Sequence, residues 1–119
     1  DRIMAVVSSH TLNGVDGTHA GGIAVSLRNL SSGEMLFDTA MDDGGRLVQD
    51  IAGNVIDPAA KYELVFATGA YWQARDIARS GAQIMDEVVV RFVMTDAAAR
   101  YHIPVILSPN SYSIWWSGE

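Results

Sequence analysis

Three side chains in this sequence have the chemistry to catalyse a hydrolysis: His10, Arg46 and His102. A neutral imidazole takes a proton from water near pH 7, a second imidazole gives a proton to a leaving nitrogen, and a guanidinium holds a developing oxyanion. Such a set supports hydrolysis without a metal. The three residues are far apart in the chain, and a lone histidine on a strand is more often structural or exposed than catalytic. Spacing alone therefore leaves both readings open.

The chain contains no cysteine, which excludes disulfides, zinc–thiolate sites, iron–sulfur clusters and thiol nucleophiles. The run Asp42-Asp43-Gly44-Gly45 lacks the further spaced oxygen ligands that calcium requires, so a solvated turn is the better interpretation. We therefore expect no metal and no cofactor. The third histidine, His19, is expected to be an exposed loop residue without a role.

Length and charge set the class of protein. A chain of 119 residues with a formal net charge of −6 is expected to form one domain over residues 1–119. No basic stripe is present to neutralise phosphates, which argues against nucleic acid and anionic membranes as partners. No apolar run approaches the ~18 residues of a membrane span. The simplest expectation is a soluble, cytoplasmic protein that acts on a small molecule.

Short segments with a two-residue hydrophobic period, separated by turn formers, predict strands. The clearest of these strands are 23–28, 62–67 and 88–94, and less regular ones are 3–12, 33–39, 101–107 and 111–116. Within 101–107, His102 alternates with Ile103, Val105 and Leu107, so its side chain is expected to face a groove while theirs fill the core.

One segment departs from this period. Residues 71–80 have Ala74, Ile77 and Ala78 at helical spacing and end at Gly81, which predicts one short helix. Many short strands with a single helix in this length favour an all-β, two-sheet antiparallel sandwich.

Five stretches resemble the transthyretin-like family, closer to its 5-hydroxyisourate hydrolases than to hormone-carrying transthyretin. They cover the chain in order: Ser9-His10-Thr11-Leu12-Asn13, Gly45-Arg46-Leu47, the run 62–71, the run 101–109, and Ser111-Tyr112-Ser113. The most specific is the Tyr101-His102-Ile103-Pro104 strand followed by Leu107-Ser108-Pro109.

This resemblance implies a sandwich of about eight strands with one short helix. It also implies a homotetramer, built as a dimer of dimers, with active sites in a channel between the dimers. The catalytic set of the family matches His10, Arg46 and His102. Water would add to a carbonyl of the six-membered ring of 5-hydroxyisourate and open that ring. The family position that matches His19 commonly holds a different residue and lends it no role.

The C-terminus departs from the family. The hydrolases usually end in Tyr-Arg-Gly-Ser, whereas this chain has Trp115, Trp116, Ser117 and Gly118, so an arginine is missing and two large rings are present. Ser113, Trp115, Trp116 and Ser117 are the expected substrate-binding residues. Strand alternation predicts that the two tryptophans point to opposite faces, with at most one in the channel.

Two substrates and two classes of function stay open. A site with fewer polar partners and more apolar surface suits an N-methylated 5-hydroxyisourate, of the kind that caffeine-like methylxanthines yield, because unmatched buried polar groups cost about 1 to 3 kcal/mol each. The tryptophans equally fit packing in the core or in an interface. The alternative function is a transthyretin-like binding protein for a small aromatic ligand in the tetramer channel.

Overall fold

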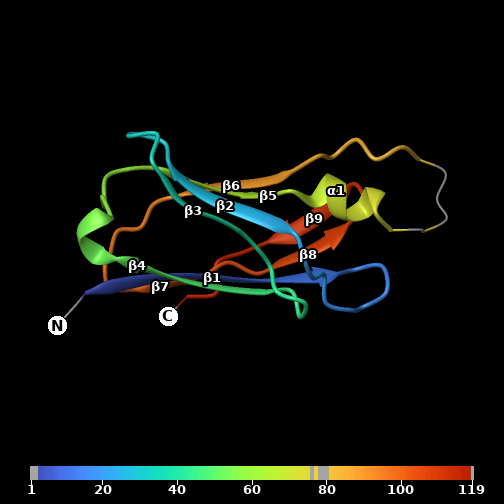
Figure 1. Ribbon diagram of the computed structural model, residues 1–119, viewed down its shortest axis with the longest axis horizontal. Helices are drawn as coiled ribbons and strands as arrows, with labels where there is room; N and C mark the ends of the chain where they lie inside the picture. Colours follow the sequence, from blue (N-terminus) through green and yellow to red (C-terminus); the bar gives the residue numbers. More distant parts are fainter. Residues whose placement is uncertain (1–2, 76, 78–80, 119) are drawn as a thin grey trace.

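The alternating segments form strands in the computed structural model, which describes residues 3–75, 77 and 81–118. Two sheets lie face to face, with one short helix at one end (Figure 1). The elements are β1 (Met4–Asn13), β2 (Ala24–Asn29), β3 (Met35–Ala40), β4 (Arg46–Ala52), η1 (Gly53–Val55), β5 (Tyr62–Phe66), α1 (Thr68–Gln73), β6 (Val88–Phe92), β7 (Arg100–His102), β8 (Val105–Ser108) and β9 (Ser111–Ile114).

One sheet has the order β4-β1-β8-β9, with β7 also paired to β1, and the other has the order β3-β2-β5-β6. The pairing is antiparallel except where β1 meets β7 and β8, which run parallel to it. The predicted all-β sandwich with one short helix is therefore confirmed, and the parallel pairs are the exception to its antiparallel character.

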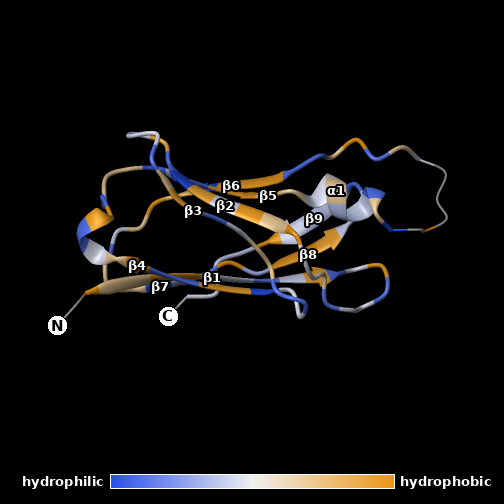
Figure 2. Ribbon diagram, viewed as in Figure 1, coloured by the Kyte–Doolittle hydropathy of each residue, from blue (hydrophilic) through white to orange (hydrophobic). Residues whose placement is uncertain are grey.

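The core lies between the two sheets and is filled by the inward positions of the strands. The largest fully buried side chains include Trp72, Tyr62, Phe66, Leu27 and Leu64. Figure 2 shows apolar colour on strands of both layers, between turns that are mostly polar. No helix in the described part of the chain is long and apolar enough to cross a membrane.

Two features of the first sheet differ from the prediction. Arg46 is the first residue of a strand, β4, that the two-residue period did not reveal. The predicted strand 101–107 is divided into β7 and β8 around Ile103 and Pro104, because a proline has no backbone N–H for the ladder. His102 is consequently the last residue of β7 instead of lying within one continuous strand, and the described residues contain nine strands instead of about eight.

The helix also differs from the prediction in position. It covers Thr68–Gln73 instead of 71–80, and it follows β5 almost directly. Trp72 on this helix is buried in the core, and the N–H of Gly69 donates to the carbonyl of Asp86 at 2.8 Å. These tertiary contacts explain why the helix begins earlier in the chain than the spacing of apolar residues predicted. Residues 76 and 78–80 of the predicted helix lie outside the described residues.

Candidate functional site

The candidate site lies on the outer face of the first sheet, the side that faces away from the second sheet. On β1 the odd-numbered residues from Ala5 to Asn13 are buried in the core, so the even-numbered ones face outward. Among these, His10 pairs with Arg46 on β4, and Ser8 pairs with His102 on β7. The strand register therefore brings the three predicted catalytic residues to one face, within two positions of one another along β1.

Arg46 is positioned by the turn that precedes β4. The carboxylate of Asp42 accepts hydrogen bonds from the backbone N–H groups of Gly44, at 2.9 Å, and Arg46, at 2.8 Å. Gly45 has a φ of +72°, and a Cβ there would lie 2.5 Å from the carbonyl oxygen of Thr11. Asp42 thus stabilises the turn, and Gly45 lets β4 approach β1 where Arg46 pairs with His10.

Gly45→Ala is expected to lower the free energy of unfolding by about 3 kcal/mol, because the left-handed backbone and the clash with Thr11 both oppose a Cβ. Gly33→Ala is the matched control, since Gly33 has a φ of +80° with open space around it. That variant is expected to cost only about 1 kcal/mol. If urea unfolding gave the same loss of unfolding free energy for both variants, the close approach of the backbone at Gly45 would contribute nothing to that loss.

His102 is held by a serine that sequence reasoning missed. The Oγ of Ser8 lies 2.8 Å from Nδ1 of His102, and the tautomer of the ring decides which of the two donates. Nε2 of His102 has no hydrogen-bond partner among the described residues, so it remains available to a ligand. Ser8 stands two positions before His10, and the same period that places His10 outward could have found it.

The surroundings of His10 favour the neutral form of its imidazole. Partial burial lowers its pKa below 6.5, and the nearby charge of Arg46 and the imidazoles of His19 and His102 act in the same direction. A hydrogen bond with the backbone of Gly44 opposes them and raises the pKa. At pH 7 the ring is therefore an uncharged group beside a fixed positive charge, able to accept or donate a hydrogen bond.

His19 is exposed, as expected, but it contacts His10 directly. Nε2 of His10 and Nδ1 of His19 are 2.9 Å apart, and the ring centroids are 4.9 Å apart. The sequence offered no local signal for this contact, because the loop after β1 must first fold back onto the strand to create it.

Ser113 shares the outer face of the sheet, although not its centre. It pairs with Ile106 on β8, and Ile106 pairs with Leu12 on β1. Ser117 lies beyond the last strand, where its backbone N–H donates to the carbonyl of His102 at 2.8 Å. The two serines thus lie beside the site. Ser113 is separated from β1 by β8, and Ser117 is bonded to the backbone of His102.

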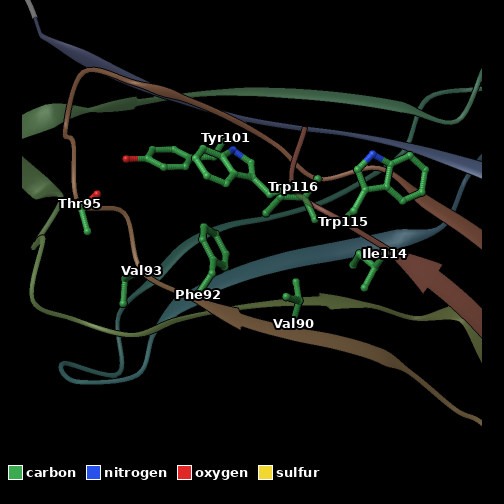
Figure 3. Close-up of a pocket in the computed structure, with 9 residues that line it drawn as sticks. Val90, Phe92, Val93, Thr95, Tyr101, Ile114, Trp115 and Trp116 are labelled. Atoms are coloured by element: carbon green, nitrogen blue, oxygen red, sulfur yellow. The ribbon is translucent and has the colours of Figure 1, made fainter. Parts of the chain in front are cut away.

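Trp115 and Trp116 lie together, away from the polar residues of the site. Because β9 ends at Ile114, strand alternation does not continue to Trp115 and Trp116, and both line one apolar hollow of about 240 Å³ between β6 and the C-terminal segment (Figure 3). Trp116 stacks on Tyr101 with ring centroids 6.4 Å apart. Tyr101 and Ile103 face the core while His102 faces outward. The prediction that the tryptophans point to opposite faces is therefore wrong, and within one chain the hollow lies on the other side of the sheet from His10.

Apolar side chains surround the polar centre of the outer face. Val48 on β4 is 61% exposed and Ile106 on β8 is 39% exposed, and both face the same side as His10. No group of three or more metal-binding side chains gathers within residues 3–75, 77 and 81–118.

Comparison with known proteins identifies similar sequences and similar folds. Residues 7–116 match the profile of the HIUase/Transthyretin family. A 5-hydroxyisourate hydrolase of Pseudomonas aeruginosa is 30% identical over 94% of this chain and 90% of its own. One from Mesorhizobium japonicum is 31% identical over 92% of this chain and 89% of its own.

Solved structures share the fold. The 5-hydroxyisourate hydrolase of Klebsiella pneumoniae aligns with a TM-score of 0.73 and 25% identity, over 96% of this chain and 99% of its own. An (S)-allantoin synthase aligns with a TM-score of 0.83 and 22% identity over 99% of this chain. This chain spans 46% of that synthase, and at this identity the likeness concerns the fold alone.

Proposed function

The chain belongs to the HIUase/Transthyretin family, and on that premise we propose that it hydrolyses the six-membered ring of 5-hydroxyisourate in purine catabolism. The observation that carries this proposal is the shared outer face of His10, Arg46 and His102, which the register of β4, β1 and β7 creates. The curated relatives that match nearly the whole chain are named for this reaction.

We propose His102 as the base, because Nδ1 is held by Ser8 while Nε2 is open. In this scheme Nε2 takes a proton from water as the water oxygen bonds to the ring carbonyl carbon. The C–N bond then breaks, and the same nitrogen returns the proton to the leaving ring nitrogen. The new carboxylic acid ionises at neutral pH. No cofactor is needed to balance this reaction.

Arg46 and His10 serve the substrate in this proposal. The guanidinium stabilises the negative charge that develops on the attacked carbonyl oxygen. His10, uncharged beside Arg46, packs its ring against the substrate while its ring nitrogens bond to His19 and to the backbone of Gly44. Ser113 and Ser117 supply further polar contacts at the rim.

The assembly is proposed to be a homotetramer, a dimer of dimers, with the outer faces lining a shared channel. The exposure of Val48 and Ile106 around the polar centre supports a face that a second chain covers. Light scattering at about four times the 12.8 kDa of one chain is the expected result. A single-domain chain over 1–119 and a cytoplasmic location stay predictions from the sequence.

An N-methylated 5-hydroxyisourate is the second proposed substrate. Trp116 is 62% exposed, and Trp115 and Ser117 connect its segment to the backbone of Pro104 and His102. Within one chain Trp116 lies on the other side of the sheet from His10, so it contacts the substrate only if the proposed tetramer brings it to the site of another chain. In that arrangement Trp116→Arg is expected to shift the ratio of rates toward the unmethylated ring by about tenfold, since a polar group replaces apolar surface. The same substitution at the neighbouring tryptophan, Trp115→Arg, is compared with Trp116→Arg in the same assay. The readout is the ultraviolet decay of freshly generated 5-hydroxyisourate and of its trimethylated analogue.

That assay also tests the alternative, a binding protein for a small aromatic ligand. The apolar hollow lined by Trp115 and Trp116 favours this reading. Acceleration of either decay supports the hydrolase. An unchanged decay of both compounds, together with quenching of tryptophan fluorescence by an apolar aromatic probe, would favour the binding protein. An unchanged ratio in Trp116→Arg would leave the tryptophans as packing residues.

A further inference from the structure

His19 occupies a position beside the site that the family resemblance does not explain. Its Nδ1 lies 2.9 Å from Nε2 of His10. The rings are tilted by 32° at a centroid separation of 4.9 Å, so they meet through their nitrogens and also through part of their faces. Among the described residues, the side-chain hydrogen-bond partner of His10 is therefore a second imidazole and not a carboxylate.

The backbone fixes His19 at this place. The N–H of Ala20 donates to the carbonyl of Thr11 at 2.9 Å, and the N–H of Asn13 donates to the carbonyl of Thr18 at 2.8 Å. These bonds pair His19 with Leu12 in antiparallel register. Since Leu12 and His10 are two apart on one face of β1, His19 is the diagonal neighbour of His10 across that pair.

The loop before His19 is itself tied down. The side chain of Asn13 accepts from the N–H of Val15 at 2.9 Å, and Asp16 accepts from both the backbone and the hydroxyl of Thr18. Thr11 adds a buried bond of 2.6 Å from its hydroxyl to the carbonyl of Ala20. The contact between the two imidazoles thus follows from a well-bonded loop, although His19 is exposed.

The groups around His10 disfavour a second proton. Arg46 faces it from β4, His102 from β7 and His19 from the loop, and all three add positive charge when protonated. The carboxylate of Asp42, in the turn before Arg46, accepts hydrogen bonds from the backbone N–H groups of Gly44 and Arg46. In the bond between His10 and His19 one ring nitrogen donates a hydrogen and the other accepts it, so the accepting nitrogen carries no proton while the bond persists.

We propose that His19 is a positioning residue for His10, which it orients through the hydrogen bond between Nε2 of His10 and Nδ1 of His19. This role rests on the proposed hydrolase function. It gives His10 a fixed ring direction before the substrate binds and lets it meet the substrate uncharged beside Arg46.

The test compares His19→Gln and His19→Ala in two experiments. In NMR titrations of the free protein, both variants are expected to raise the pKa of His10, because the electrostatic effect of His19 is among the causes that lower it. In pH–rate profiles, His19→Gln is expected to keep the plateau kcat, since its amide still bonds His10. His19→Ala is expected to lose about tenfold in kcat, because the ring is no longer held.

Thr18→Ala is the matched control, since it removes the hydroxyl bond to Asp16 in the same loop and touches no imidazole. It is expected to leave the His10 titration unchanged. The proposal is overturned if His10 titrates alike in the wild type and His19→Ala, or if Thr18→Ala shifts it as much as His19→Ala does. The NMR arm needs no substrate, so a protein that fails to open the ring refutes the proposed function without deciding the role of His19.

Discussion

His102→Asn is expected to lower kcat for ring opening by about a thousandfold while leaving the fold intact. An amide cannot accept the proton of the attacking water, and the loss of a general base typically costs between about 10² and 10⁴ in rate. His102 is half-buried on the outer face and contributes nothing to the core, so thermal unfolding should change little. The measurement is steady-state decay of 5-hydroxyisourate, with circular dichroism as the check of folding.

Ser8→Ala refines this first prediction. It removes the 2.8 Å bond to Nδ1 of His102 but keeps the imidazole, so we expect a loss of about tenfold in kcat, since the ring loses its orientation. A kcat for His102→Asn within about threefold of the wild type would remove His102 from the mechanism.

Arg46→Ala is expected to reduce kcat/KM by about a hundredfold to a thousandfold, the usual cost of losing one donor to a developing oxyanion. The same variant is expected to raise the pKa of His10, because the charge of Arg46 is among the causes that lower it. Stopped-flow rates and an NMR titration of His10 measure the two effects separately.

Two further variants make this second prediction specific. Arg46→Lys keeps the charge and loses the planar fork, so we expect the His10 titration to stay near that of the wild type while part of the rate is lost. Arg28→Ala removes a positive charge from an exposed position on β2, in the other sheet, and should change neither quantity. Equal effects from Arg28→Ala and Arg46→Ala would mean that net charge, and not the position of Arg46, is responsible.

The sequence predicted the strands whose apolar residues alternate cleanly. Val25 and Leu27 on β2, and Val88, Val90 and Phe92 on β6, face inward as expected. β4 was not predicted, because its inward-facing row contains the polar Gln49 and its outward-facing row contains the exposed Val48. Hydrophobicity therefore does not alternate along β4, although the strand does.

The candidate site was predicted residue by residue, but not its contacts. Alternation correctly placed His102 on the outer face, opposite to Ile103 and Val105. The pairing of Ser8 with His102 and of His10 with Arg46 depends on strand register, which local sequence does not encode. His19 reaches His10 only through the folded loop. The prediction that the tryptophans point to opposite faces assumed that the strand continues to Trp116, whereas β9 ends at Ile114.

The most direct test of the account is hydrolysis of freshly generated 5-hydroxyisourate in ¹⁸O-labelled water, with the wild type and His102→Asn side by side. The account predicts rapid ring opening by the wild type, with one ¹⁸O atom in the new carboxylate, and a rate close to the spontaneous one for His102→Asn. A wild-type rate equal to the spontaneous decay, or equal rates for the two proteins, would contradict the claim that this face of the sheet is a hydrolytic site.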